Sequence, residues 1–324
     1  MSPRNYHSHT HLCKHGTGTV SDYCEAALAC GMDVIAVTDH CPYPDGRWIG
    51  VRMELDLLPM YMREFDEARK AYPQLKIVAG VECEYDKEMV QFQKETFIGQ
   101  CGMRCIAGAI HSFKHKGEWR HTFITEMDVA ELHSYTDYLI ESMDSGVFTF
   151  LAHPDLFGVH HRGWDADCDA CSRAIVQAAI QHDLPLEINA NGIRKGLIED
   201  GGTKRWQYPW RPFWEIAGEY GAKVLVNSDA HTPSQIWEKC DECMEFAREL
   251  GLNVINDTFY EDYIETLMLG AKSRILRIDN RPWTNLQLAA LYDKNFVDNI
   301  PLLAIETATH KQRGAIKMNF GKVL

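Results

Sequence analysis

The sequence feature that most restricts the fold is a regular alternation of apolar runs with segments of helical periodicity. After a short first strand that begins near Asn5, six runs have the composition of buried strands: residues 33–40, 76–85, 104–111, 147–153, 185–189 and 223–231. Nearly continuous apolar strands are typical of a parallel sheet that helices cover on both faces. Residues 19–30 show the helical spacing, with Val20 and Cys24 on one apolar stripe and Gly31 at its end.

Other segments between the strands have the same helical character: residues 55–72, 87–100, 127–145, 167–182, 211–220 and 234–250. The alternation predicts an α/β fold in which parallel strands close, or nearly close, into a β/α barrel. The pattern changes beyond about Lys272, where residues 274–278 have the composition of a last strand and residues 286–293 that of a short helix. A cap on the barrel and a dimer contact are the two roles open to this tail.

Histidines and acids stand where the predicted strands end, which is where parallel α/β folds place their sites. His7 and His9 alternate on an extended strand and therefore point to the same side, and His15 follows a short turn. The full set holds only nitrogen and carboxylate ligands: His7, His9, His15, His40, Glu82, His111, His153, Asp229 and His231. Buried imidazoles and carboxylates need partners, so metal ions explain this set better than a surface histidine cluster or a purification tag does.

Nine ligands are too many for one ion and suit two or three, with Glu82 as the simplest bridge. Divalent zinc, iron and manganese all accept imidazole-rich sites with a bridging carboxylate, so the metal stays open. The remaining histidines are expected in loops or helices, mostly in contact with water: His11, His115, His121, His133, His160, His161, His182 and His310. The CxxC pairs Cys168–Cys171 and Cys240–Cys243 lie in helix-like sequence, which favours buried thiols over a zinc ribbon.

The polar residues occur in motifs with a definite order along the chain: His7-Ser8-His9-Thr10, His15-Gly16, Thr38-Asp39-His40, Gly80-Val81-Glu82, His111, Leu151-Ala152-His153-Pro154-Asp155 and Ser228-Asp229-Ala230-His231. Motifs of these types in this order resemble those of the polymerase and histidinol phosphatase (PHP) superfamily. The resemblance covers roughly residues 5–235 and is nearest to the PHP-type histidinol-phosphatases. The stretches that carry this nearer match are His15–Thr17, Thr38–Pro44, Glu187–Lys195 and Tyr208–Pro209.

This resemblance implies a distorted seven-stranded β/α barrel with a metal site at the carboxyl ends of its strands. The change of pattern beyond about Lys272 divides the chain into a catalytic domain of residues 1–275 and a C-terminal extension of residues 276–324. By the family pattern three ions would be held by three sets of side chains: His7, His9, Glu82 and Asp229; Glu82, His111 and His153; His15, His40 and His231. Asp39 and Glu84 stand where the family often has Glu and Asp, an exchange that changes only the length of each acid.

The resemblance also implies a metal-dependent phosphomonoesterase, in which a metal-bridging hydroxide attacks a small phosphate ester. L-Histidinol phosphate is the best single substrate, which would place the protein in histidine biosynthesis. Three cations are candidates to bind the phosphate: Arg194, Arg162 and Lys195. A guanidinium matches two phosphate oxygens at once, so Arg194, just after the strand at 185–189, leads this group. Asp39 or a metal-bound water is the candidate to protonate the leaving group.

The tryptophans at 206–214 are expected to stack on the imidazole of such a substrate or simply to pack in the fold. The alternative enzyme is a PHP phosphoesterase for another small phosphate, namely a sugar phosphate, a nucleotide or a phosphodiester. A related hydrolase of C–N bonds is disfavoured, since such enzymes carry a carboxylated lysine where this chain has Glu82. A non-catalytic PHP scaffold is also disfavoured, because it would be expected to lose ligands and all nine are present.

The net charge and the hydropathy of the chain restrict the classes of partner that it can bind. The 324 residues carry a net charge of −13, which makes nucleic acid and anionic membranes poor partners. No apolar run approaches the length of a membrane span, and the first motif begins at residue 7, so neither a span nor a signal peptide is expected. We therefore expect a cytoplasmic protein that binds a small phosphorylated substrate. Its oligomeric state, a homodimer included, stays open.

Overall fold

The computed structural model describes residues 2–123 and 126–265, and these divide into two compact units. Within the described part, the larger unit contains residues 2–90 and 105–259, and the smaller contains residues 91–104 and 260–265. The predicted strand at 274–278, the predicted helix at 286–293, the extension from 276 and His310 lie outside the described residues. No helix among the described residues is long and apolar enough to cross a membrane.

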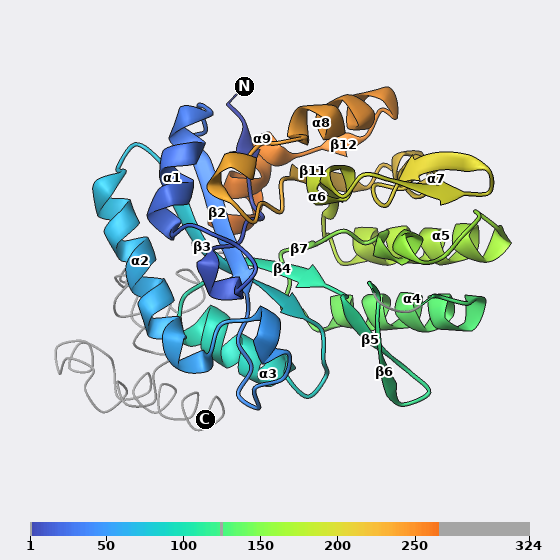
Figure 1. Ribbon diagram of the computed structural model, residues 1–324, viewed down its shortest axis with the longest axis horizontal. Coiled ribbons are helices and arrows are strands. Elements are labelled where there is room, and N and C mark those ends of the chain that lie inside the picture. Colours follow the sequence, from blue (N-terminus) through green and yellow to red (C-terminus); the bar gives the residue numbers. More distant parts are fainter. Residues whose placement is uncertain (1, 124–125, 266–324) are drawn as a thin grey trace, which may run out of the picture. The chain divides into compact units, whose positions relative to one another are not determined.

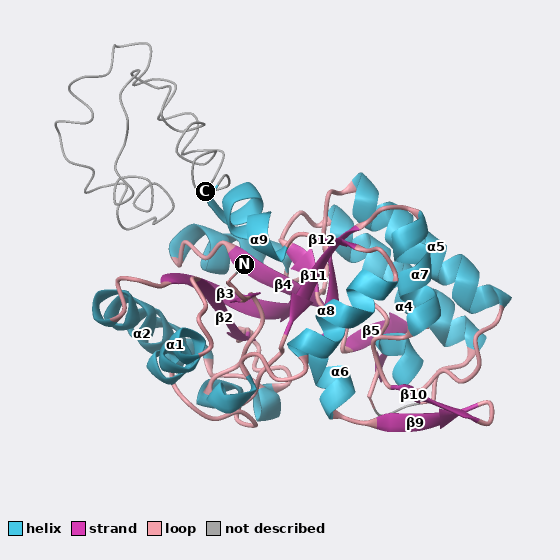
Figure 2. Cartoon of the chain, turned by 90° about the horizontal axis from the view of Figure 1, so that it is seen from above, coloured by secondary structure: helices cyan, strands magenta, loops and turns pink. Residues whose placement is uncertain are grey.

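The larger unit is built on one parallel sheet (Figures 1 and 2). Its described strands run in the order β1-β2-β3-β4-β7-β8-β11-β12. Their bounds are β1 Arg4–Asn5, β2 Val34–His40, β3 Lys76–Glu84, β4 Cys105–Ala109, β7 Phe150–Leu151, β8 Leu186–Asn189, β11 Lys223–Asn227 and β12 Asn253–Val254. The seven predicted strands are all present, several shorter than expected, and the two-residue β12 extends the sheet beyond β11.

The sheet curls until its two sides meet again. Ser8, which follows β1, forms an isolated parallel bridge with Ala230, which follows β11. The amide of His9 donates to the carbonyl oxygen of Ala230 at 2.8 Å, and that of Thr17 donates to the carbonyl oxygen of His231 at 2.8 Å. The first and the last motif of the chain therefore lie side by side, as a distorted barrel requires.

Helices cover the outside of the sheet, as the alternation predicted. Their bounds in the larger unit are α1 Val20–Ala29, α2 Leu58–Ala71, α4 Val129–Asp144, α5 Ala166–Gln181, α6 Ala190–Arg194, α7 Arg211–Glu219, α8 Cys240–Glu249 and α9 Asn256–Phe259. Neighbouring helices pack in pairs, α1 with α2, α4 with α5 and α5 with α7 (Figure 1). Side-chain caps begin several of them, as where Thr19 and Asp22 satisfy each other's backbone amides at the start of α1.

The helix predicted over residues 87–100 is α3, Val90–Gln93, followed by a π-helical stretch, Lys94–Gln100. This stretch belongs to the smaller unit, together with the second π-helical turn, Tyr260–Glu265.

Two hairpins were not predicted from the sequence. β5, Ser112–His115, pairs antiparallel with β6, Glu118–His121, and β9, Leu197–Asp200, pairs antiparallel with β10, Thr203–Trp206. Each is joined by two residues with positive φ, at 116–117 and at 201–202. Turns of this kind favour glycine, so Gly117 and the pair Gly201-Gly202 are the signals that sequence reasoning passed over.

The cysteines of both CxxC motifs are buried free thiols on helices, as predicted. Cys168 and Cys171 lie on α5, and Cys240 and Cys243 lie on α8. Their burial raises the pKa of each thiol, to about 12 for Cys168. They are therefore packing residues of the two helices.

Candidate metal centre and its cavity

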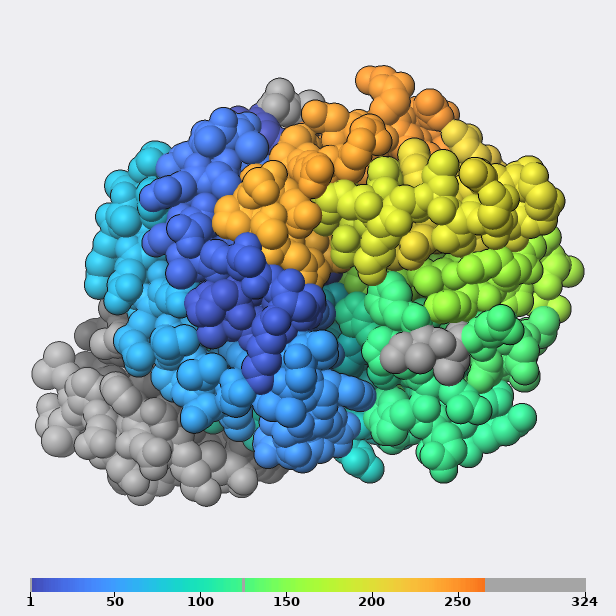
Figure 3. Space-filling model, viewed as in Figure 1, coloured from blue at the N-terminus to red at the C-terminus, as the bar shows by residue number. Residues whose placement is uncertain are grey.

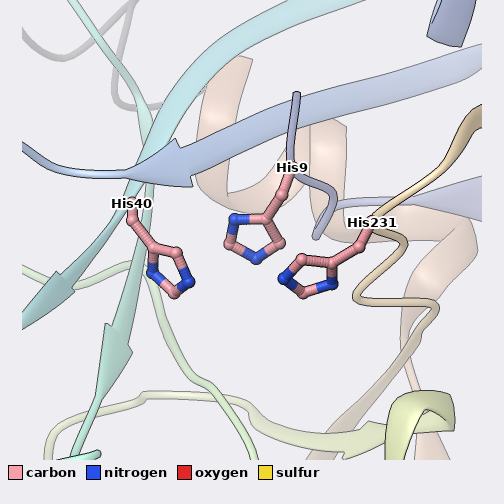
Figure 4. A group of neighbouring side chains, drawn as sticks. All are labelled: His9, His40 and His231. Atoms are coloured by element: carbon pink, nitrogen blue, oxygen red, sulfur yellow. The ribbon is translucent and has the colours of Figure 1, made fainter. Parts of the chain in front are cut away.

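All nine predicted ligands lie in the larger unit, in or just after parallel strands. His40 ends β2 and Glu82 lies in β3, while His111, His153 and Asp229 follow the ends of β4, β7 and β11 by two residues. The rings of His9, His40 and His231 point into one space between these strand ends (Figure 4). The ring centroids of His9 lie 4.3 Å from His40 and 4.4 Å from His231.

A first group of donors surrounds the Nε2 atoms of His7 and His9. These two nitrogens lie 3.1 Å apart, and His9 Nε2 lies 3.1 Å from Asp229 Oδ1. The two oxygens of Glu82 lie 3.5 Å from His7 Nε2 and from His9 Nε2. Four lone-pair donors therefore converge where the resemblance implies the first ion.

A second group lies on the other side of Glu82. Its Oε1 is 3.1 Å from His153 Nε2 and 3.7 Å from His111 Nε2. Its Oε2 is 2.9 Å from His40 Nδ1. Glu82 therefore stands between the two groups, as the predicted bridging carboxylate would, and it brings His40 close to the second group.

The third predicted group is more open. His15 Nε2 lies 3.1 Å from His231 Nε2, and the ring centroid of His15 lies 5.2 Å from that of His40. His15 and His231 come from the segment after β1 and the segment after β11, which the barrel closure joins. In the space-filling view the N-terminal segment, in blue, lies against the later segment, in orange (Figure 3).

In four of these histidines Nδ1 contacts an oxygen atom, so Nε2 is the nitrogen that faces the centre. The Nδ1 contacts are His7 with Glu187 Oε1 at 2.8 Å, His15 with Cys13 O at 2.7 Å, His111 with Glu84 Oε1 at 2.5 Å and His231 with Asp229 O at 3.1 Å. An acceptor at Nδ1 holds the proton there and leaves the Nε2 lone pair for a metal. The buried Nδ1 atoms of His9 and His153 have no hydrogen-bond partner among the described residues.

The charges of the centre also fit metal ions. Burial would raise the pKa of Glu82, but His7, His111 and His40 hold it well below its usual value. Burial lowers the pKa of His9, yet the neighbouring carboxylates of Asp229 and Asp39 raise it to about 9. Without a cation, the buried carboxylates thus draw protons onto His7, His9 and His111, whereas burial and the charge of His9 lower the pKa values of His15, His40 and His231. A divalent ion supplies the same positive charge and releases those protons, as metal binding to histidine and carboxylate requires.

A cavity of about 380 Å³ opens onto these donors. Its walls include several residues that sequence reasoning did not select: Trp48, Arg52, His121, Phe123, Asn191 and Tyr208. Asn191 Nδ2 donates to Asp229 Oδ2 at 3.1 Å and so orients one of the predicted ligands. His121 was expected among the solvated histidines, but the unpredicted β5–β6 hairpin brings it to the cavity.

Of the three predicted phosphate-binding cations, the structure brings one to the cavity. Lys195 lines it, with Nζ 4.0 Å from the ring centroid of Phe123. Arg194 does not line it; its guanidinium donates to the carbonyl oxygens of Ser228 at 2.6 Å and Asp229 at 2.9 Å. Arg162 does not line it either, and donates to the carbonyl oxygen of Val159 at 2.6 Å. Carbonyl oxygens within reach of each guanidinium hold these two arginines outside the cavity.

Asp39 is buried and does not line the cavity. Its Oδ2 accepts hydrogen bonds from the amide and the hydroxyl of Thr10, and its Oδ1 accepts one from the amide of His40. Asp39 therefore orients the segments that carry His9 and His40, and the structure does not place it against a leaving group.

The tryptophans at 206–214 do not reach this cavity. Trp206 and Trp210 line a separate cavity of about 680 Å³, and Trp214 is fully buried with Nε1 donating to Asp155. Packing is therefore their role, and stacking on a substrate at the metal centre is excluded for them.

Two histidines that were expected to be solvated, His115 and His161, are buried, and each contacts an oxygen through Nδ1.

Comparisons with known proteins give the same answer as the motifs. The family model of the PHP domain matches residues 5–191. The chain is 30% identical over 255 residues to a probable histidinol-phosphatase of Deinococcus radiodurans, an alignment that covers 76% of this chain and 92% of that protein. It is 22% identical over 218 residues to the DNA polymerase/3'-5' exonuclease PolX of Bacillus subtilis, covering 67% of this chain and 32% of that protein.

Two solved structures share the fold. The putative histidinol phosphatase of Listeria monocytogenes matches with a TM-score of 0.63 and 18% identity, over 74% of this chain and 99% of that one. The histidinol phosphate phosphatase of Lactococcus lactis, solved with zinc, L-histidinol and phosphate, matches with a TM-score of 0.61 and 16% identity, over 78% of this chain and 95% of that one. With the family model matching more than half of its residues, the chain belongs to the PHP domain family.

Proposed function

We propose that this protein is a metal-dependent phosphomonoesterase that hydrolyses a small phosphate ester, with L-histidinol phosphate as the leading substrate and L-histidinol and phosphate as products. The observation that carries the proposal is the convergence of nine nitrogen and carboxylate ligands, seven of which line one cavity, with Glu82 between two of the three groups. Similarity to the Deinococcus histidinol-phosphatase over three quarters of the chain supports the substrate. The catalytic domain of residues 1–275 belongs to the same proposal.

The nine side chains suit two or three divalent transition metal ions, with zinc, iron and manganese as the candidates. In this proposal the ions are held by the three sets that the resemblance implies. The proximity of their members supports the first two sets, and the approach of His15 to His231 supports part of the third. When bound, such ions supply a water of lowered pKa and positive charge for the phosphoryl oxygens. Zinc has support from the Lactococcus enzyme, whose structure was solved with zinc.

The chain's own residues bind and orient the ester around that centre. Lys195 offers an ammonium to a phosphoryl oxygen from the cavity wall. Phe123 and Tyr208 hold this ammonium over their rings, with Nζ 4.0 Å and 5.6 Å from the two centroids. The aromatic walls at Trp48 and Phe123 offer apolar surface to the organic part of the ester. Arg162 and Arg194 act through the backbone segments they hold.

The experiment is phosphate release from a panel of esters by full-length protein, with metal content quantified on the same sample. The panel contains L-histidinol phosphate, a sugar phosphate, a nucleoside monophosphate and a phosphodiester. We expect selective turnover of L-histidinol phosphate and its loss in His7→Ala, which removes a ligand of the first group. Lys116→Ala, in the two-residue turn between β5 and β6, is the matched control and retains wild-type turnover.

Two results would change the conclusion. If other monoesters are hydrolysed far faster than L-histidinol phosphate, the proposed phosphomonoesterase activity is supported and the proposed substrate is rejected. Absence of monoester turnover in protein with its metals loaded overturns the phosphomonoesterase, and cleavage of the diester in that sample assigns the chain to the phosphodiesterases of the family. A role in histidine biosynthesis stays a prediction that depends on selective turnover of L-histidinol phosphate. The cytoplasmic location also stays a prediction.

A further inference from the structure

Among the described residues that line the cavity, two carry a permanent positive charge, Lys195 and Arg52. Lys195 was selected from the sequence, and Arg52 was not. Arg52 lies in the segment between β2 and α2, just after Trp48 and Val51, which also line the cavity. With Arg162 and Arg194 held outside, Arg52 is the guanidinium that the fold brings to the substrate space.

The side chain of Arg52 is buried, with only 4% of its surface exposed. Its Nη2 donates to Glu84 Oε1 at 2.8 Å. Its Nε and Nη1 are buried and have no hydrogen-bond partner among the described residues. A desolvated guanidinium with two unsatisfied N–H groups has already lost its water, so an anion that reaches these groups gains more than it would at a solvated arginine.

The surroundings of Arg52 hold its orientation. Its Cζ lies 5.4 Å from the ring centroids of both Tyr43 and Trp48. Glu84, its acceptor, also accepts from the amide of His111 at 2.8 Å and contacts His111 Nδ1 at 2.5 Å. One carboxylate therefore orients both the arginine and a predicted ligand of the second group, so an anion bound by Arg52 would lie beside that group of ligands.

We propose that Arg52 is a phosphate-binding residue, in which an N–H group without a protein partner, on Nη1 or on Nε, donates to a non-bridging phosphoryl oxygen of the ester and of the product phosphate beside the second group of ligands. Lys195 binds the phosphoryl group from the opposite segment, after α6. The inference rests on the proposed phosphatase function. It assigns to Arg52 the phosphate-binding role that the sequence analysis expected of Arg162 and Arg194. A guanidinium held in one orientation suits the recognition of a phosphoryl oxygen.

The test is the affinity of metal-loaded protein for inorganic phosphate, measured by calorimetry in wild type, Arg52→Met and Arg52→Lys. Loss of charge-assisted hydrogen bonds weakens binding by about tenfold to a hundredfold in Arg52→Met. Arg52→Lys keeps the charge without the planar guanidinium and gives an intermediate affinity. The matched control is Arg205→Met, which removes a guanidinium stacked on Trp210 in the other cavity and leaves phosphate affinity unchanged.

Metal content and thermal midpoint are measured on every variant, because a residue that acts only through Glu84 would reduce metal binding and leave the phosphate site intact. Wild-type phosphate affinity in Arg52→Met at full metal content overturns the proposal. If Arg52→Met loses metal or fails to fold, Arg52→Lys decides, and wild-type affinity there at full metal content overturns it as well. Phosphate binding that depends on Arg52 in a protein that hydrolyses no monoester would support this site and reject the proposed function.

Discussion

At the scale of single residues, the candidate centre depends on side chains that contact the predicted ligands and hold their orientation. Glu187, fully buried on β8, is the clearest example. Its Oε1 contacts His7 Nδ1 at 2.8 Å, and its Oε2 accepts from the amide of His153 at 3.1 Å. One carboxylate thus orients a member of the first group and a member of the second.

We predict that Glu187→Gln lowers metal affinity or activity by about tenfold to a hundredfold, the usual cost of losing such a partner. The amide has lost the negative charge that holds the proton on His7 Nδ1, so the Nε2 lone pair is no longer fixed toward the centre. Competition with a chelator and turnover of the ester panel measure the two effects. Glu199→Gln, the same change on the exposed β9, is the control, and equal metal affinity in both variants would contradict the prediction.

At the scale of elements, the centre is positioned by strands that approach one another closely. Gly80 lies in β3 between β2 and β4. A Cβ at this position would lie 2.2 Å from the carbonyl oxygen of Cys105 on β4 and 2.8 Å from a methyl of Thr38 on β2. Only glycine allows the spacing of these three strands, and two of them carry His40 and Glu82.

Gly80→Ala is therefore expected to lower the free energy of unfolding by about 1–3 kcal/mol, because the neighbour in collision is backbone and cannot turn away. The thermal midpoint should fall by about 2–4 °C for each kcal/mol if the larger unit, which has the size of a domain of about 150–250 residues, unfolds as one. Gly50→Ala, where an added Cβ meets nothing within 4 Å, provides the comparison. If the thermal midpoints of Gly80→Ala and Gly50→Ala differ by less than about one degree, the strands accommodate the added methyl group without loss of stability, and the prediction is wrong.

The β9–β10 hairpin gives a pH-dependent prediction. Burial opposes the ionisation of Asp200, but hydrogen bonds from Arg205 Nε at 2.5 Å and from the amide of Gly163 at 2.7 Å lower its pKa below the usual 3.8. A carboxyl group with a lowered pKa in the folded state stabilises it above the unfolded pKa, and this contribution is lost as the pH falls through the folded pKa.

Asp200→Asn should therefore lower the free energy of unfolding at pH 7 by about 1–3 kcal/mol, the cost of an unpaired, partly buried partner. The difference from wild type should shrink as the pH falls below about 3.8. Denaturant unfolding at both pH values measures it. Glu199→Gln removes an exposed ion pair with Lys204 in the same hairpin and should change stability by less than about 1 kcal/mol. A difference at Asp200 that does not vary with pH would reject this account.

At the scale of the whole molecule, the centre joins the beginning and the end of the barrel. His7 and His9 follow β1, Asp229 and His231 follow β11, and the Ser8–Ala230 bridge holds the two segments together. Ions bound by these residues would stabilise the closed barrel, since the unfolded chain has no preformed site. The stability of the larger unit and its metal content should be linked.

We expect chelation to lower the thermal midpoint and added zinc or manganese to restore it. Free metal at about a hundred times its dissociation constant contributes about 2.7 kcal/mol to the free energy of unfolding. Differential scanning calorimetry with and without chelator measures the shift. His9→Ala should lose most of the response, whereas His133→Ala, on an exposed position of α4, should retain it. A midpoint that is indifferent to metal in the wild type would count against a metal centre.

The sequence by itself determined the parallel α/β fold and the nine residues that meet at one end of it. Buried strands have a composition that needs no tertiary information, and polar residues at their carboxyl ends, such as His40 and Glu82, must lie at the same edge of a parallel sheet. The order of the motifs then pointed to the PHP domain family, which the family model confirms.

Only the tertiary structure decided which further side chains face the cavity. Arg194 and Lys195 are neighbours in sequence, yet one is held by the carbonyls of Ser228 and Asp229 and the other lines the cavity. Arg52 and Trp48 come to the cavity on a segment between β2 and α2, and His121 comes on a hairpin. The path of such segments depends on long-range contacts such as Arg52 with Glu84, which leave no periodic pattern in the chain.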